Sequence, residues 1–402
     1  MLPTASNTTF AVCCKIYKNS LVTQVSFLFF GGKSMKDDFL NKLISYKTNS
    51  NVKGINDCME YLKNILEEYN WQTLILKNNE DEKNNLIAVL NGGLSNLEDG
   101  LLLAGHIDTV ETNEKKWHSD PWSLSTDKDN FYGLGVSDMK SFTSSLLVNL
   151  GKISKLNLKK PLIFCLTNDE ETVMYSINKV CEFLKNKKIK PHYAIIGEPN
   201  SLKFSNSNKG FYEFETSIFG RACHSSNPKL GINSIYIMSK FITFLENLAS
   251  KYEKLDTTMN VGIINGGRMC NMVADNCTIR WEVRTFSVAV IDQIKKETND
   301  YLQSLIQEYQ GAGFVENIVF KIPAFEYKEV DLTKRLMSKY NICETPYGAA
   351  TEAGFYQELG IDCIIYGAGD IKDAHSINEK LNINDYEKYC ELLFEMIKDI
   401  CG

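Results

Sequence analysis

The fold class is indicated most clearly by the stretch Leu101-Leu102-Leu103-Ala104-Gly105-His106-Ile107-Asp108. In this stretch an almost continuous apolar run ends in polar side chains. A short run of this kind is typical of a strand in a sheet that helices cover on both faces. In open α/β sheets, ligands bind beyond the carboxyl ends of the strands. The stretch therefore predicts an α/β fold and places His106 and Asp108 where a site would form.

Further apolar runs flank this stretch, and segments with helical spacing separate them. The patterns predict buried strands at 86–90, 161–167 and 194–196, an alternating strand at 71–77, and helices at 37–46, 56–69, 141–150 and 176–186. This order of elements predicts a three-layer α/β domain.

The pattern changes near residue 209. Residues 211–219, 260–264 and 277–284 alternate like strands with one solvated face, and 232–252 have helical spacing. After Phe314 we expect a return to helix (332–339, 386–400) and buried strand (363–366). The sequence thus predicts an α/β domain of residues 35–208 and 318–402, interrupted by an α+β sandwich at 209–317.

Residues 1–34 contain no acidic residue and carry the apolar stretch 21–30. They fit either a leader peptide or an extension that precedes the natural start at Met35. The lack of a small-residue cleavage site favours the extension.

Composition excludes several classes of protein. The 402 residues include 44 Lys and Arg against 50 Asp and Glu, a net charge of −6, which argues against nucleic acid as the main partner. No apolar run reaches the roughly 18 residues of a membrane helix. The 12 cysteines are scattered without a CxxC pair, which predicts reduced thiols and a cytoplasmic location.

His106 with Asp108 two residues later is typical of a metal ligand whose second ring nitrogen a carboxylate orients, although a capped loop histidine has the same pattern. Asp138 lies in the glycine-rich turn Gly133–Lys140 and could be a ligand or the N-cap of helix 141–150. Further candidates follow the ends of other predicted strands or lie near the C-terminus: Asp169, Glu170, Glu171, Glu198 and His375.

Two histidines and three or four carboxylates exceed one tetrahedral site but suit two ions that share a bridging carboxylate. Without a cation, so many buried carboxylates would repel one another. The absence of cysteine among them fits Zn²⁺, Co²⁺ or Mn²⁺, and we expect two Zn²⁺.

The motifs, taken together, resemble those of the M20 family of dinuclear zinc deacylases and exopeptidases. They are Gly105-His106-Ile107-Asp108-Thr109-Val110, Ser137-Asp138-Met139-Lys140, Asp169-Glu170-Glu171, Gly197-Glu198-Pro199, Gly220-Arg221-Ala222-Cys223-His224-Ser225-Ser226 and Ala374-His375-Ser376-Ile377-Asn378-Glu379. The resemblance runs from about Met35 to the C-terminus. It implies a zinc-exopeptidase-like catalytic domain with an inserted lid or dimerisation domain.

The resemblance also implies how the metal ligands are shared. Asp138 would bridge the two ions. His106 and Glu198 would complete one site, and Glu171 and His375 would complete the other.

The resemblance assigns three further residues to catalysis. Glu170 would be the general base, Asp108 would orient His106, and His224 of the insertion would stabilise the oxyanion, often by reaching across a homodimer.

Within the family, Thr351–Gln357, Gly367–Ile371 and Trp281–Arg284 are similar to the branch that deacetylates N²-acetylornithine in arginine biosynthesis. By the same resemblance, the candidates for binding the small N-acyl amino acid substrate are Lys209, Asn271 and Arg284. Alternatively, Arg284 could be a solvent-exposed charge at a strand edge. Glu352 would meet a cationic substrate side chain or form a structural ion pair.

Several other functions remain open. Within the family they are succinyl-diaminopimelate desuccinylase, aminoacylase and dipeptidase activity. From another class, a catalytically silent binding or dimerisation protein would keep the same fold.

Overall fold

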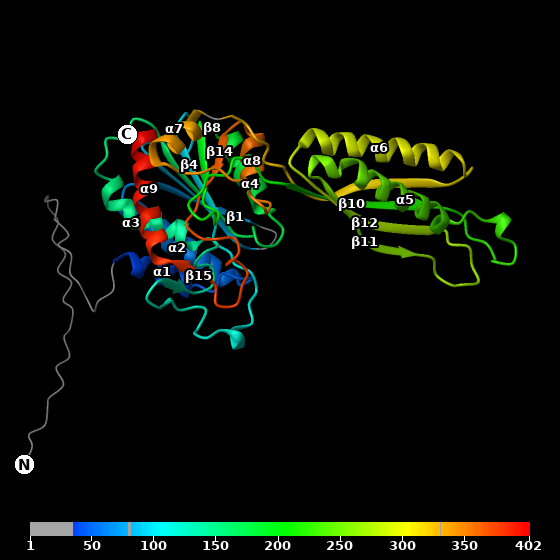
Figure 1. The fold of residues 1–402 in the computed structure, drawn as a ribbon, viewed down its shortest axis with the longest axis horizontal. Helices are drawn as coiled ribbons and strands as arrows, with labels where there is room; N and C mark the ends of the chain where they lie inside the picture. Colours follow the sequence, from blue (N-terminus) through cyan, green and yellow to red (C-terminus); the bar gives the residue numbers. More distant parts are fainter. Residues whose placement is uncertain (1–34, 79–81, 330) are drawn as a thin grey trace, which may run out of the picture. The chain divides into compact units, whose positions relative to one another are not determined.

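A six-stranded sheet carries His106 in the computed structural model, which describes residues 35–78, 82–329 and 331–402 (Figure 1). The predicted extension, residues 1–34, lies outside the described residues. The strand order is β1-β2-β7-β4-β9-β14. The strands are β1 (Gln72–Lys77), β2 (Asn84–Leu90), β4 (Leu101–His106), β7 (Leu162–Thr167), β9 (Tyr193–Ile196) and β14 (Asp362–Ile365).

Four neighbouring strands of this sheet, β7, β4, β9 and β14, run parallel, whereas β2 runs antiparallel to β7 and β1 antiparallel to β2. His106 pairs with Thr167, and Ala104 pairs with Ile196. The strands β4, β7 and β9 therefore end at one edge of the sheet, so the loops that follow them meet there.

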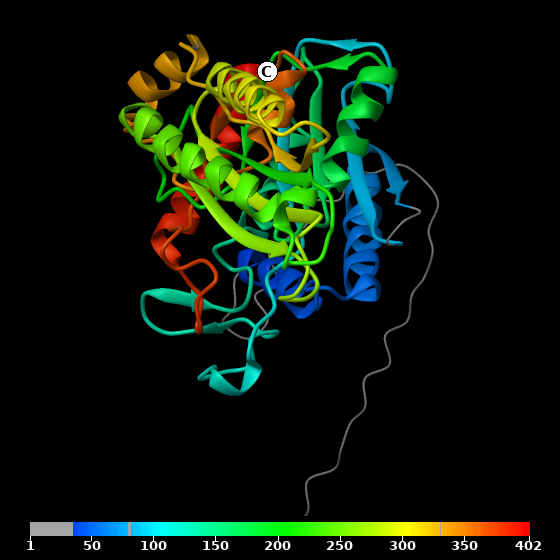
Figure 2. The ribbon, with the colours of Figure 1, turned by 90° about the vertical axis from the view of Figure 1, so that its right-hand side faces the viewer.

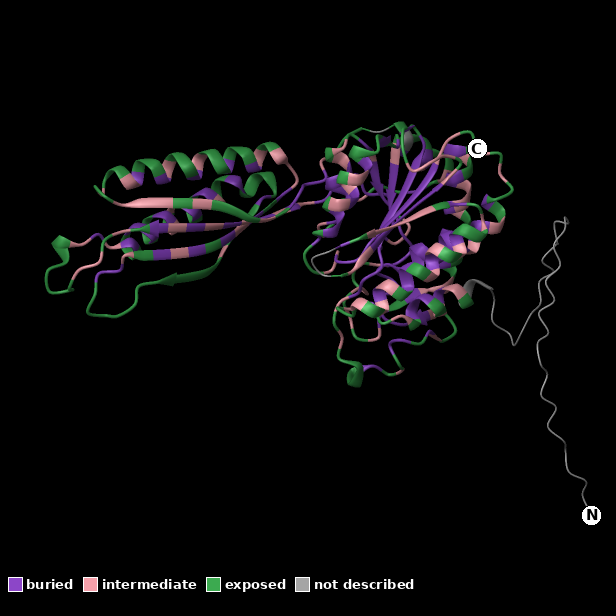
Figure 3. Cartoon of the chain, turned by 180° about the vertical axis from the view of Figure 1, so that it is seen from behind, coloured by how far each residue is buried: buried purple, intermediate pink, exposed green. Residues whose placement is uncertain are grey.

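Helices cover both faces of the six-stranded sheet. Leu103 and Phe164 pack in the core with α1 (Met35–Ser45), α2 (Val52–Glu68), α3 (Lys140–Ile153), α7 (Asp331–Tyr340) and α9 (Ile383–Cys401). Leu102 and Ile163 point the other way, into the core with α4 (Ser176–Asn186) and α8 (Ala353–Glu358). Strands β4 and β7 are buried along their whole length, whereas the edge strand β1 is half-buried or exposed throughout (Figure 3). The predicted three-layer α/β architecture is confirmed.

A second, four-stranded antiparallel sheet has the order β11-β12-β10-β13. Its strands are β10 (Gly210–Phe219), β11 (Thr258–Gly266), β12 (Asn276–Thr285) and β13 (Gly313–Ile322). Helices α5 (Ser234–Tyr252) and α6 (Val288–Gln307) lie over one face of it (Figures 1 and 2). Burial alternates along β10 and β12, as predicted, and Trp281 stacks on Phe214 at 4.2 Å between ring centroids.

Strand β13 corrects one expectation, because the chain does not return to helix directly after Phe314. Gly313–Ile322 pairs with β10 along its length. As an edge strand it is exposed on much of both faces, so its apolar residues do not alternate, which is why the sequence pattern missed it. The strand runs across residue 317, where the predicted insertion ends, and the domain division itself stays a prediction.

Shorter elements form a three-stranded sheet of order β15-β6-β5, a two-stranded sheet of β3 and β8, and three 3₁₀ turns. They are β3 (Leu97–Glu98), β5 (Ser125–Thr126), β6 (Asn130–Tyr132), β8 (Ile189–Lys190), β15 (Lys380–Asn382) and the 3₁₀ turns η1 (Glu114–Lys116), η2 (Pro228–Leu230) and η3 (Glu253–Leu255). Among the described helices, none combines the length and the apolar character that a membrane span requires.

Candidate metal centre

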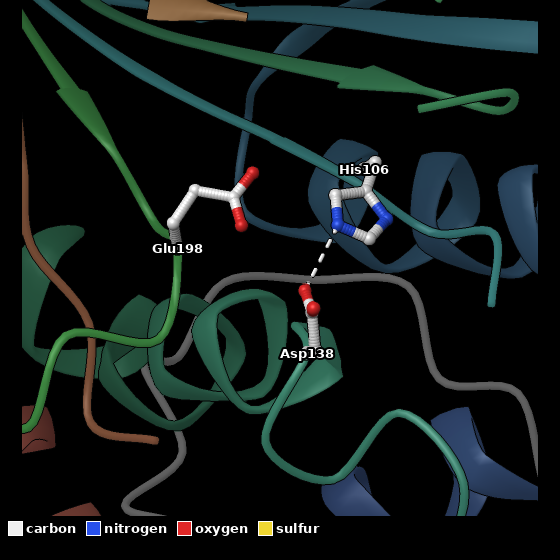
Figure 4. A group of neighbouring side chains, drawn as sticks. All are labelled: His106, Asp138 and Glu198. Atoms are coloured by element: carbon white, nitrogen blue, oxygen red, sulfur yellow. Dashed lines mark hydrogen bonds and ion pairs between the residues drawn. The ribbon is translucent and has the colours of Figure 1, made fainter. Parts of the chain in front are cut away.

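The first potential metal site forms where β4 and β9 end. His106 closes β4, Glu198 follows β9, and Asp138 lies in the turn before α3, with all three side chains buried (Figure 4). The His106 Nε2 atom lies 3.1 Å from Asp138 Oδ1. One ligand atom from each of the three residues lies within 4.8 Å of the other two. This spacing can hold one cation.

The second group shares Asp138 with the first. His375 Nε2 lies 2.7 Å from Glu171 Oε2 and 3.6 Å from Asp138 Oδ2. Ligand atoms of these three residues again lie within 4.8 Å of one another. The two oxygens of Asp138 therefore face different groups, as a bridging ligand requires. Capping of α3 by Asp138 is not observed, because Met139 occupies the N-cap position.

Asp108 acts on its neighbours in two ways. Its backbone carbonyl oxygen lies 3.0 Å from His106 Nδ1, nearer than its carboxylate oxygen Oδ1 at 3.5 Å. The carboxylate accepts hydrogen bonds from the backbone N–H of Glu170 at 3.2 Å and of Glu171 at 3.0 Å. Asp108 thus fixes the His106 ring mainly through its carbonyl, and it also holds the turn that carries the two glutamates.

Glu170 lies beside the first group without belonging to either. Its Oε2 atom is 3.9 Å from His106 Nε2, and its side chain is largely buried. A carboxylate in this position, next to potential metal sites but not within their ligand sets, can accept a proton from water or from a substrate group.

Burial and mutual repulsion shift the pKa values of the cluster. Burial, followed by the charge of Glu198, raises the pKa of Glu170 well above its ordinary range, and burial with the charge of Asp138 does the same for Glu198. Burial likewise raises the pKa of Glu171. Burial lowers the pKa of His106, but its contacts with Asp108 and Asp138 outweigh this and hold it well above its usual value. Each shift opposes the excess negative charge.

The donor set fits bound cations. Glu198 Oε1 is buried and has no hydrogen-bond partner within the described part of the chain. A buried oxygen without a partner is costly, and a cation would satisfy it. Imidazole nitrogens and carboxylate oxygens without cysteine suit Zn²⁺, Co²⁺ or Mn²⁺.

Apart from Glu352, the other predicted residues of catalysis and substrate binding lie in or near the four-stranded sheet. His224 is exposed, and its Nδ1 lies 2.8 Å from Ser226 Oγ. Asn271 is exposed in the neighbouring loop, where its carbonyl oxygen accepts the Ser225 N–H. No contact recorded between described residues joins either side chain to the two metal groups, so their roles stay predictions.

Lys209 and Arg284 already have partners. Lys209 Nζ forms an ion pair with Asp256 at 2.8 Å. The exposed Arg284 side chain lies over the Phe211 ring at 4.6 Å and pairs with Glu282 at 3.2 Å. Since β12 is flanked by β11 and β10, Arg284 is not on an edge strand. A substrate carboxylate would have to compete with these acidic partners.

Glu352 is buried, with 1% of its surface exposed. Burial raises its pKa to about 8, although the hydroxyl of Thr167 acts in the opposite direction. Across the described ranges, no Lys, Arg or His forms an ion pair with it. Contact with a substrate side chain would need a rearrangement of the surrounding core, so this role too stays a prediction.

Sequence reasoning missed the roles of two carboxylates next to the ligands. Asp169 accepts hydrogen bonds from the backbone N–H groups of Tyr175 and Ser176 at the start of α4. Glu379 accepts three backbone N–H groups of the loop that ends in Asp138. Both lie inside the quoted motifs, but their partners are backbone amides, which a side-chain pattern does not reveal.

Comparison with known proteins shows that the chain is similar to hydrolases of one family. Residues 102–399 match the sequence profile of peptidase family M20/M25/M40. The chain is 32% identical over 353 residues to an acetylornithine deacetylase of Buchnera aphidicola, covering 85% of this chain and 91% of the relative. It is 31% identical over 357 residues, with the same coverage, to an acetylornithine deacetylase of Pasteurella multocida.

Solved structures share the fold at lower sequence identity. Aminopeptidase PepT from Bacillus cereus has a TM-score of 0.70 at 18% identity, covering 91% of this chain and 98% of that one. The YXEP protein of Bacillus subtilis, described as a dinuclear metal-binding peptidase of the M20 family, has a TM-score of 0.66 at 14% identity, covering 91% and 98%. These likenesses concern the fold.

Proposed function

The chain belongs to peptidase family M20/M25/M40 and is a hydrolase of that family, and we propose that it hydrolyses the amide bond of N²-acetylornithine to give ornithine and acetate, a step of arginine biosynthesis. One observation carries the proposal: two groups of potential ligands share Asp138 at the carboxyl edge of the six-stranded sheet. The identity to acetylornithine deacetylases over 85% of the chain supports the choice of substrate.

Two Zn²⁺ are the proposed cofactors, with Asp138 between them. His106 and Glu198 complete one site, and Glu171 and His375 complete the other. When bound, such ions polarise an acyl oxygen and lower the pKa of water.

Residues of the chain perform the proton transfers. Glu170 takes a proton from the attacking water and passes it to the departing amine nitrogen, so that acetate and the free amine are released. Asp108 keeps Glu170 in place by accepting its backbone N–H. His224 donates a hydrogen bond to the oxyanion of the tetrahedral intermediate, and its contact with Ser226 orients the ring.

A homodimer through the four-stranded sheet segment is the proposed assembly. Its edge strand β11 exposes Ile263 and Ile264 by 51% and 54%. An apolar unpaired edge favours pairing with another strand. The exposed position of His224 fits a residue that reaches the site of a second copy, and light scattering of the purified protein tests the assembly.

The proposed location is a reducing cytoplasm. In the part of the chain that the structure describes, the buried cysteines Cys58, Cys165, Cys277, Cys363 and Cys401 are free thiols. Scattered free thiols are typical of proteins from reducing compartments.

A substrate panel tests the proposal. We expect the Zn²⁺-loaded enzyme to have its highest kcat/KM on N²-acetylornithine, above succinyl-diaminopimelate, other N-acyl amino acids and dipeptides. Glu170→Gln should lower kcat by at least about 10²-fold with little change in metal content, because it removes only the proton acceptor.

Two outcomes would contradict the proposal at different levels. A higher kcat/KM on another member of the panel would replace the substrate but keep the chemistry. Loss of bound metal in Glu170→Gln, or full activity in that variant, would remove Glu170 from the role of base.

A further inference from the structure

The carboxylate of Glu379 holds the backbone of the loop that delivers Asp138. Its Oε2 atom accepts the N–H of Gly135 at 2.7 Å, and its Oε1 atom accepts the N–H groups of Ser137 at 2.7 Å and Asp138 at 3.0 Å. The residue is 1% exposed. One buried side chain therefore satisfies three backbone donors within four residues of chain.

The position of Glu379 in the fold links the loops that carry Asp138 and His375, two members of the second group. It lies four residues after His375 and directly before β15, which pairs with β6 just upstream of Gly133. Its own carbonyl oxygen also accepts the Gly133 N–H at 3.3 Å. The segment that supplies His375 is thus fastened to the loop that supplies Asp138.

The loops also approach closely at a second point. A Cβ atom at Gly369 would lie 2.0 Å from Ser137 Oγ, so only glycine fits there. Gly135 has a φ of +81°, a conformation that side chains other than glycine rarely adopt. These two glycines restrict the backbone of the Gly135–Asp138 loop to one conformation, and Glu379 accepts three of its N–H groups.

We propose that Glu379 is a positioning residue for the metal centre: by accepting the N–H groups of Gly135, Ser137 and Asp138, it sets the Asp138 backbone so that the two carboxylate oxygens face the two cation sites. This inference rests on the proposed function. An ionised carboxylate offers two acceptor oxygens, whereas glutamine offers one oxygen and an NH₂ group that is itself a donor. In Glu379→Gln at least one buried backbone N–H loses its partner, and the loop shifts.

A measurement of metal affinity distinguishes a Glu379 that positions Asp138 from a Glu379 that only stabilises the fold of the loop. Both sites use Asp138, so we expect Glu379→Gln to weaken Zn²⁺ binding at both sites by about 10-fold to 100-fold, measured by competition with a chelator. Asn378→Gly is the matched control: it removes the neighbouring side chain, which accepts the His118 N–H at 2.7 Å, and glycine suits the φ of +62° found there. The control should keep wild-type affinity at both sites.

The outcomes separate the inference from the proposed function. Wild-type affinity at both sites in a folded Glu379→Gln protein, checked by circular dichroism, would overturn the inference alone. A wild-type protein that binds fewer than two ions would overturn the proposed function and the inference with it. If Glu379→Gln does not fold, Glu379→Asp decides: its shorter side chain cannot reach all three amides, and unchanged affinity at both sites would equally overturn the inference.

Discussion

Excess negative charge defines the candidate centre at the scale of single residues. Asp138, Glu170, Glu171 and Glu198 lie around His106 in a largely buried space, and the pKa values of the three glutamates are raised. Carboxylates with raised pKa values hold protons at pH values where free glutamate has lost them. We therefore expect the metal-free centre to keep protons at pH values where free glutamate has lost them, and binding of cations to displace these protons.

Proton release on metal binding follows from these shifts. Since the acids release protons as the pH rises, the affinity for Zn²⁺ should increase with pH, and binding near neutral pH should release at least one proton per chain. Calorimetric titration of the metal-free protein in buffers of different ionisation enthalpy measures the number. An observed enthalpy that is independent of the buffer would contradict the prediction.

Glu352 predicts a second pH effect, on stability. Its pKa is raised from 4.5 to about 8 by burial, so the folded state binds this proton more tightly than the unfolded state does. The stabilisation from the protonated form is complete below about pH 4.5 and is lost as the pH rises towards 8. Glu352→Gln keeps an uncharged side chain of similar size and should be spared this loss.

Chemical denaturation of the metal-free wild type and Glu352→Gln at several pH values measures the difference. The free energy of unfolding of the wild type should fall relative to the variant between pH 5 and pH 8. A difference that stays constant over this range would show that Glu352 titrates normally.

The sequence predicted the site residues at strand ends but not the residues that act on backbone amides, and the difference has a physical reason. His106, Glu170, Glu171 and Glu198 end or follow apolar runs, and the parallel register brings such ends together. Glu379 and Asp169 act on backbone amides, so their importance depends on loop conformations that residue spacing does not specify. His224 and Asn271 lie in loops that flank strands of the other sheet, and nothing in local sequence fixes their distance from the centre.

At the scale of elements, Asp169 connects the candidate centre to helix α4. Its carboxylate accepts the N–H of Tyr175 at 2.9 Å, the N–H of Ser176 at 3.0 and 3.1 Å, and the Ser176 hydroxyl at 2.6 Å. These donors lie at the first turn of the helix, where no preceding carbonyl is available to them. The carboxylate thus caps α4 from seven residues upstream.

Removal of this cap should destabilise the protein. We expect Asp169→Ala to lower the free energy of unfolding by about 1–2 kcal/mol, the usual cost of a lost N-terminal cap. Asp169→Asn retains one acceptor oxygen and should lose less than half as much. Urea denaturation of both variants measures the effect, and an alanine variant as stable as the wild type would contradict the assignment.

Strands with a continuous or alternating apolar pattern were predictable from sequence, and a strand without either pattern was not. The buried strands of the six-stranded sheet lie within a few residues of their predicted ranges, because burial on both faces requires continuous apolar runs, and the half-buried β1 was found from alternation. Strands β10 and β12 were found from alternation, since helices cover one face of their sheet. Strand β13 forms the opposite edge from β11, and without a buried face along its length it carries no such pattern.

At the scale of the whole molecule, two sheets contribute different parts of the proposed chemistry. The six-stranded sheet brings the ligands and Glu170 together, whereas His224 lies in a loop that follows β10 of the four-stranded sheet. Where the chain passes between the two sheets, Asn208 and Phe325 exchange two backbone hydrogen bonds, of 3.0 and 3.1 Å.

Elemental analysis of dialysed, Zn²⁺-loaded protein shows whether Asp138 is shared by two cations. We predict about two ions per chain in the wild type, about one in Glu171→Ala and in Glu198→Ala, and almost none in Asp138→Ala, because only Asp138 belongs to both ligand groups. Asp129→Ala, which removes an exposed carboxylate outside both groups, should keep two. A single ion in the wild type, or two ions retained in Asp138→Ala, would contradict the account.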